Sequence, residues 1–209
     1  MKRSKTSKQW MHEHVSDQYV RRAQQDGYRS RAAYKLLEID ERDHLLKRDM
    51  IVVDLGASPG GWSQVAAAKV GERGKIIAVD LLPLCPIRGV EFVLGDFREE
   101  EVLAKIENSL NGNKIGLVIS DMSPNISGID IIDQACAMYL AELALDFSST
   151  HLEPSGSFLV KVFQGRGFEE YIKLMRNCFS RVVTRKPDSS RGRSNELYLL
   201  GTGKFVSGV

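Results

Sequence analysis

The chain has 209 residues, of which 43% are hydrophobic and 27% charged, a composition typical of a globular protein and not of a disordered or fibrous one. No apolar run approaches the roughly 20 residues of a membrane span, and no apolar stretch follows the basic N-terminus as in a secretory signal. The three cysteines are odd in number and far apart, which argues against a disulfide framework or a zinc site. We therefore expect one domain over residues 1–209, in the cytoplasm and without a membrane.

The basic residues are concentrated near the two ends of the chain, although the formal net charge is only +2. Residues 1–35 carry nine Lys and Arg against three acidic residues, and a second basic cluster covers residues 181–193. The pattern predicts a large anionic partner such as RNA; a solubilising tail with an ordinary charged face is the alternative. The candidate phosphate contacts are Lys2, Arg3, Lys5, Lys8, Arg29, Arg31, Arg191 and Arg193.

Strands and helices alternate along the chain after a polar N-terminal segment. Residues 1–12 predict a flexible basic arm, and Ser30 is expected to cap a helix that runs to about Leu46. The predicted strands are 51–55, 75–79, 91–94, 115–120, 157–163, one near 182–183 and 196–200. The predicted helices that follow are 62–70, 98–110, 132–152 and 168–179, with a turn at 153–156. Continuously apolar strands separated by helices indicate a parallel sheet covered on both faces, which binds ligands at the carboxyl ends of its strands.

A glycine-rich loop, DLGASPGGW, follows the first predicted strand. Glycine at such a turn lets the backbone come close to a ligand, although this signal alone is weak. The middle glycine of the dinucleotide fingerprint is replaced by Ser58, with Pro59 next, so the loop suits a nucleoside without a diphosphate. An NAD-dependent oxidoreductase is therefore the weaker alternative.

Acidic residues follow the next three predicted strands. Asp80 ends the second strand, where a carboxylate can accept hydrogen bonds from both hydroxyls of a ribose. Asp96 follows the third strand and is placed to accept from an adenine amino group, and Asp121 follows the fourth. Helix capping would explain any one of them, but all three together favour S-adenosylmethionine, with S-adenosylhomocysteine as the product.

Six motifs of the chain resemble the FtsJ/RrmJ (RlmE) family of ribosomal RNA 2′-O-methyltransferases. They are DLGASPGGWSQ, VDLLPL, GDF, SDMSPNISG, SGSFLVKVFQG and RKPDSSRGRSNELYLL. The resemblance implies a Rossmann-like class I fold, with a mostly parallel seven-stranded sheet and helices on both faces. It further implies that a monomer transfers a methyl group from S-adenosylmethionine, without a metal, to an A-loop uridine of 23S ribosomal RNA in the large (50S) subunit.

The resemblance also assigns site residues. The family's catalytic Lys-Asp-Lys-Glu set falls on Lys35, Asp121, Lys161 and Glu196. Its cofactor contacts fall on Gly60, Trp62, Asp80, Asp96 and Asp121. Ser58 stands where the family's loop has alanine, a small change.

The residue types suit methylation of a hydroxyl group. A lysine can act as a general base if its pKa falls, or as a cation that orients the hydroxyl, and the sequence leaves both roles open. Lys161 interrupts an apolar strand, where an unpaired lysine is costly to bury. Glu196 without the resemblance would indicate only an ion pair with Arg191 or Arg193. Two alternatives keep the fold: a methyltransferase for transfer RNA or an mRNA cap, and a non-catalytic RNA-binding assembly factor.

Overall fold

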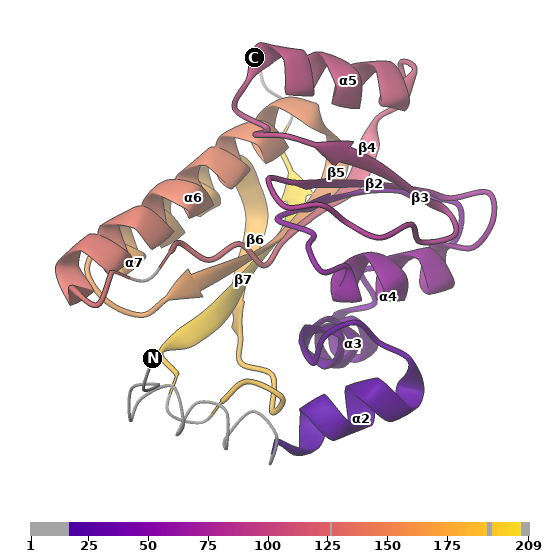
Figure 1. Ribbon diagram of the computed structural model, residues 1–209. Helices are drawn as coiled ribbons and strands as arrows, with labels where there is room; N and C mark the ends of the chain where they lie inside the picture. Colours follow the sequence, from indigo (N-terminus) through magenta and orange to yellow (C-terminus); the bar gives the residue numbers. More distant parts are fainter. Residues whose placement is uncertain (1–16, 126, 192–193, 206–209) are drawn as a thin grey trace.

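The computed structural model describes residues 17–125, 127–191 and 194–205. In this part of the chain, seven strands form one sheet in the order β3-β2-β1-β4-β5-β7-β6 (Figure 1). They are β1 (Ile51–Leu55), β2 (Lys75–Asp80), β3 (Val90–Leu94), β4 (Ile115–Ser120), β5 (Leu152–Phe163), β6 (Phe179–Arg185) and β7 (Glu196–Lys204). Strands β1 to β5 pair in parallel, and β7 lies antiparallel between β5 and β6. The predicted mostly parallel seven-stranded sheet is confirmed.

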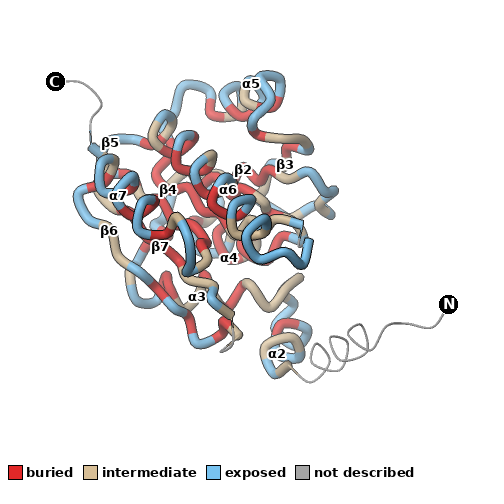
Figure 2. Tube along the Cα trace, turned by 90° about the vertical axis from the view of Figure 1, so that its left-hand side faces the viewer, coloured by how far each residue is buried: buried red, intermediate tan, exposed pale blue. Residues whose placement is uncertain are grey.

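Helices cover both faces of the sheet, and each face has its own apolar core. Helices α5 (Glu100–Leu110), α6 (Asp130–His151) and α7 (Phe168–Cys178) pack on one face, against Val118 and Phe158. Helices α3 (Ala32–Asp43) and α4 (Gly61–Val70) pack on the other, where Leu36 and Val65 meet Leu117. Figure 2 shows the buried residues gathered along the strands between these layers. Each such buried aliphatic side chain stabilises the fold by roughly 1.5–3 kcal/mol.

A polar helix, α2 (Gln18–Asp26), precedes α3 and is not predicted by the sequence. Only three of its nine residues are apolar and only Ala23 is buried, so its apolar face is too small to stand out in the sequence. The carboxylate of Asp17 caps it by accepting from the backbone N–H of Tyr19 at 3.0 Å. Gly27 ends it in the left-handed conformation, with φ of 76°.

The predicted bounds of the next helix are wrong at both ends. The residue at the N-cap of α3 is Arg31, and no side chain caps the helix there, so Ser30 does not have the predicted role. The helix ends at Asp43 because His44 takes the left-handed conformation, with φ of 52°.

The turn predicted at residues 153–156 lies inside strand β5. The pairing of β4 with β5 moves from Ile115 opposite Leu152 to Leu117 opposite Ser157, so the intervening residues form an irregular bulge. Ser155 has φ of 68° there. The turn-forming residues are accommodated as a strand irregularity because the sheet continues on both sides of them.

Candidate active site

A pocket of about 600 Å³ lies at the carboxyl ends of strands β1 to β4. Asp80, Asp96 and Asp121 all line it, so the structure brings together the three carboxylates that the sequence places after successive strands. Gly56 lines it too, with φ of 77°, and a Cβ at this position would overlap the side chain of Met122. This position therefore favours glycine for both its conformation and its close approach to the neighbouring loop.

The carboxylate of Asp80 joins two loops of this pocket. It accepts hydrogen bonds from the backbone N–H of Ser58 at 2.8 Å and of Leu82 at 2.7 Å. These contacts hold the glycine loop against the loop that follows β2. A carboxylate has about four acceptor positions, so Asp80 keeps capacity for the hydroxyls of a ligand.

Asp96 makes a close ion pair with Arg98 at the far side of the pocket. The hydrogen bonds from this guanidinium lower the pKa of Asp96, in opposition to partial burial. Asp96 is therefore ionised at neutral pH. An ionised carboxylate can accept a hydrogen bond from an amino group that enters the pocket.

Lys161 and Asp121 form an ion pair at the edge of the pocket, with Lys161 buried and Asp121 partly buried. The ammonium Nζ of Lys161 donates to the backbone carbonyl of Asp121 at 2.6 Å and lies 3.2 Å from its Oδ1. Burial would raise the pKa of Asp121, but the positive charges of Lys161 and Lys35 outweigh burial and the pKa is lowered. Asp121 is thus held as an anion beside Lys161, whose side chain is only 7% exposed.

Lys35 and Glu196 form the second pair, with Nζ of Lys35 2.6 Å from Oε1 of Glu196. Among the described residues, the ion-pair partner of Glu196 is therefore Lys35, from helix α3, whereas Arg191 lies near Asp17 and Arg193 is outside the described ranges. The hydroxyl of Ser190 also donates to Oε1 of Glu196, at 3.0 Å. All four residues of the lysine-and-acid set thus lie in two ion pairs.

Tyr198 connects the two pairs and is missed by the sequence interpretation. Its hydroxyl lies 2.7 Å from Oδ1 of Asp121 and 3.3 Å from Oε1 of Glu196. Burial and the two negative charges raise its pKa well above the ordinary value, so Tyr198 stays a hydrogen-bond donor. One signal was available: Tyr198 is two residues after Glu196, and alternate residues of a strand share a face.

Another ionisable group, Asp54, is buried in strand β1, shortly before the glycine loop. Its Oδ2 accepts from the hydroxyl of Ser63 at 2.6 Å, while its Oδ1 has no hydrogen-bond partner among the described residues. Burial raises the pKa of Asp54 to about 7, although the Ser63 hydrogen bond acts against it.

Two predicted cofactor residues do not line this pocket. Gly60 is the N-cap of α4, with φ of 108°. Trp62 is buried, donates its indole N–H to the carbonyl of Ala32 at 2.8 Å, and packs against Tyr198 with ring centroids 5.7 Å apart. Their direct contact with a cofactor stays a prediction, and what the structure shows for Trp62 is packing against Tyr198.

The predicted RNA contacts are only partly described. Lys2, Arg3, Lys5, Lys8 and Arg193 lie outside the described residues.

The described basic residues of this set contact the protein itself. The guanidinium of Arg29 donates to the carbonyls of Cys85 and Pro86, and that of Arg31 contacts Asp17 and the carbonyl of Ser189. Arg191 lies 3.9 Å from Asp17. Arg29 thus braces the loop beside the pocket, and Arg31 ties the N-terminal helices to the loop that precedes β7.

Within the described ranges, no three or more His, Cys, Asp or Glu side chains are grouped to hold a metal ion. None of the helices there is both long and apolar enough to cross a membrane.

The chain is similar to known methyltransferases along nearly its whole length. The model of the FtsJ-like methyltransferase family matches residues 28–204. Ribosomal RNA large subunit methyltransferase E of Methylobacillus flagellatus is 61% identical over 201 residues, which cover 96% of this chain and 97% of the relative. The protein of the same name from Nitrosospira multiformis is 62% identical over 204 residues, covering 98% and 99%.

The fold is also similar to that of a solved structure. The crystal structure of a Plasmodium falciparum chain assigned as a ribosomal RNA methyltransferase superimposes with a TM-score of 0.75 at 30% identity, and the match covers 85% of this chain and 98% of that one. The resemblance carried by the sequence motifs is therefore confirmed. This chain belongs to the FtsJ-like methyltransferase family.

Proposed function

We propose that this protein transfers the methyl group of S-adenosylmethionine to a ribose 2′-hydroxyl in large-subunit ribosomal RNA, at the A-loop uridine of 23S RNA. The names of its relatives support the RNA substrate. The observation that carries the ribose position is the pairing of Lys161 with Asp121 at the edge of a pocket lined by three carboxylates. A hydroxyl group needs such a site because it is a weak nucleophile that must be oriented and must lose its proton.

The residues of the pocket fit S-adenosylmethionine. Asp80 would hold the ribose hydroxyls and Asp96 the adenine amino group, and Gly56, which lines the pocket, lets the glycine loop approach Met122 closely. When bound, S-adenosylmethionine supplies a methyl group on a sulfonium, which leaves as the neutral thioether S-adenosylhomocysteine.

Lys161 would act on the oxygen that receives the methyl group. An ammonium has three N–H donors, and Asp121 takes two of them through its carbonyl and Oδ1. The third would be donated to the 2′-hydroxyl oxygen and would align its lone pair with the methyl carbon. The hydroxyl proton would leave to water as the new oxygen–carbon bond forms, while Lys161 stabilises the negative charge that develops on oxygen.

The other members of the set would hold Lys161 in place. Tyr198 fixes Oδ1 of Asp121, and Glu196 is fixed in turn by Lys35 and Ser190. Contacts with RNA phosphates would come from Arg29, Arg31, Arg191 and the basic residues outside the described ranges. We expect the protein to act as a monomer in the cytoplasm, without a metal.

The test compares Lys161→Ala with Lys173→Ala, which removes an exposed lysine of α7. The substrates are large subunits and 23S RNA from a strain that lacks the enzyme, with transfer RNA and capped RNA as alternatives. We expect Lys161→Ala to lower methyl incorporation by roughly 10²–10⁴-fold. Its affinity for S-adenosylmethionine in calorimetry should stay within about twofold of wild type, and Lys173→Ala should match wild type.

The position of the methyl group is read separately, by resistance of the modified nucleotide to alkaline cleavage. A fully active Lys161→Ala variant would contradict the proposed role of this lysine. A methyl group on a base would contradict ribose methylation, and incorporation only into transfer RNA or capped RNA would contradict the ribosomal substrate.

A further inference from the structure

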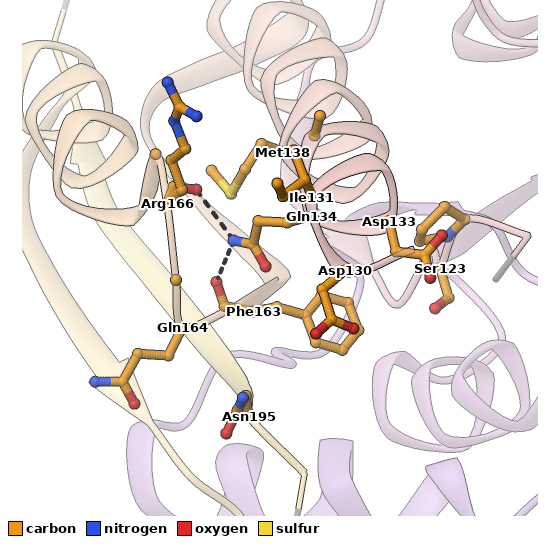
Figure 3. Close-up of a pocket in the computed structure, with 14 residues that line it drawn as sticks. Ser123, Asp130, Ile131, Asp133, Gln134, Met138, Phe163, Gln164, Arg166 and Asn195 are labelled. Atoms are coloured by element: carbon orange, nitrogen blue, oxygen red, sulfur yellow. Dashed lines mark hydrogen bonds between the residues drawn. The ribbon is translucent and has the colours of Figure 1, made fainter. Parts of the chain in front are cut away.

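A second pocket, of about 700 Å³, adjoins the first and has no assigned role (Figure 3). Ser123 and Pro124 line both pockets, so the segment after β4 separates them. The second pocket is bounded by the start of α6, the end of β5, the loop between β5 and α7, and Asn195, which precedes β7. We propose that it receives the nucleobase of the nucleotide whose ribose is methylated, an inference that rests on the function proposed above.

The second pocket lies beside the lysine-and-acid set, although none of the four residues lines it. Phe163, which lines it, pairs with Glu196 across the β5–β7 ladder, and its ring centroid lies 6.0 Å from Nζ of Lys161. Asn195 lies directly before Glu196. A ribose held at Lys161 carries its base on the neighbouring ring carbon, so the base must enter a space beside this lysine. On the proposed function the first pocket would be filled by the cofactor, and the second offers that space.

The lining suits a neutral, planar group that carries donors and acceptors. Phe163 supplies an aromatic ring for stacking, and the side-chain amides of Gln164 and Asn195 supply both donors and acceptors. Within the described chain, no hydrogen bond engages either amide, and both residues are exposed. Two aspartates outnumber the one arginine in the same lining, which disfavours a phosphate there and favours a base that can donate an N–H.

The wall that carries these groups is fixed by hydrogen bonds. The amide of Gln134, on α6, donates to the carbonyls of Phe163 at 3.0 Å and Arg166 at 3.1 Å, drawn as dashed lines in Figure 3. The backbone N–H of Gln164 donates to the carbonyl of Asn195 at 2.9 Å. The pocket is therefore formed before a ligand enters, which lowers the cost of ordering it on binding.

The first test truncates the two amides. Gln164→Ala and Asn195→Ala are compared with Asn177→Ala, an exposed amide at the other end of α7. On large subunits from a strain that lacks the enzyme, we expect each pocket variant to lower kcat/KM about tenfold, the effect of one lost hydrogen bond to a base. Affinity for S-adenosylmethionine should be unchanged within about twofold, and Asn177→Ala should behave as wild type.

The second test distinguishes base recognition from a general structural effect. The same enzymes are assayed on subunits whose ribosomal RNA carries a different base at the methylated position. If the amides contact that base, truncating them should lower kcat/KM by a factor that is at least about threefold smaller on the altered subunits than on the unaltered ones. The reason is that the change of base and the change of side chain remove the same contact.

Three outcomes are decisive. Equal fractional losses on both kinds of subunit, or no loss from either pocket variant, would overturn the nucleobase site while leaving the methyltransferase function intact. A wild-type enzyme that is inactive on unaltered subunits would instead overturn the proposed function, and the nucleobase site with it.

Discussion

The buried carboxyl group of Asp54 predicts a pH-dependent loss of stability. The residue is only 1% exposed, Ser63 is the hydrogen-bond partner of Oδ2, and no described residue is a partner of Oδ1. Burial raises its pKa to about 7, and the charges of Asp121 and Asp80 act in the same direction. In the unfolded chain the pKa of an aspartate is about 4. Between these two values, the folded chain keeps a proton that the unfolded chain releases.

The sign and size of the effect follow from this difference. A pKa that is raised by folding contributes stability that is fully present below about pH 4 and is lost as the pH rises through about 7. Each pH unit in this window corresponds to about 1.4 kcal/mol. Between about pH 5 and about pH 8.5, the predicted loss in the free energy of unfolding is therefore about 3 kcal/mol.

The informative variant is Asp54→Asn, which has no ionisable group at this position. Its new amide N–H₂ lacks a partner, so it loses stability by an amount that does not depend on pH. The stability of the variant relative to wild type should therefore rise by about 3 kcal/mol between about pH 5 and about pH 8.5. Urea unfolding at a series of pH values measures this difference, with Asp146→Asn, an exposed residue of α6, as the control. A difference that stays constant over this range would refute the reasoning.

Two further substitutions test the contacts around the site. Tyr198→Phe removes the hydroxyl that contacts Asp121 and Glu196. We expect the free energy of unfolding in urea to fall by about 1.5–3 kcal/mol, and methyl transfer to slow at unchanged cofactor affinity. Wild-type turnover would contradict the positioning role of Tyr198. Asp43→Asn breaks a two-point contact with Arg185, whose hydrogen bonds lower the pKa of Asp43. We expect a loss of about 2 kcal/mol above pH ~4 that disappears as the pH falls through the lowered pKa, and a pH-independent loss would contradict this assignment.

Part of the site follows from local sequence. The apolar strands predict a parallel sheet, and three acids come at the ends of these strands, Asp80, Asp96 and Asp121. Because the carboxyl ends of parallel strands lie at the same edge of a sheet, the sequence is enough to group these acids there. Glu196 is different, because its own neighbourhood in the sequence indicates an arginine partner. Only the family resemblance selects it, and the structure pairs it with Lys35, which is far away in the chain.

What the sequence by itself determined is therefore the alternation of strands and helices, the glycine loop and the acids at the strand ends, because these depend on residues close together in the chain. The tertiary structure alone decided that Lys35 reaches Glu196, that Tyr198 joins two ion pairs, and that Arg29 and Arg31 contact the protein itself. It also decided that the polar segment of α2 is helical. Such contacts depend on sheet order, strand register and the packing of distant segments, and no local pattern of residues specifies these.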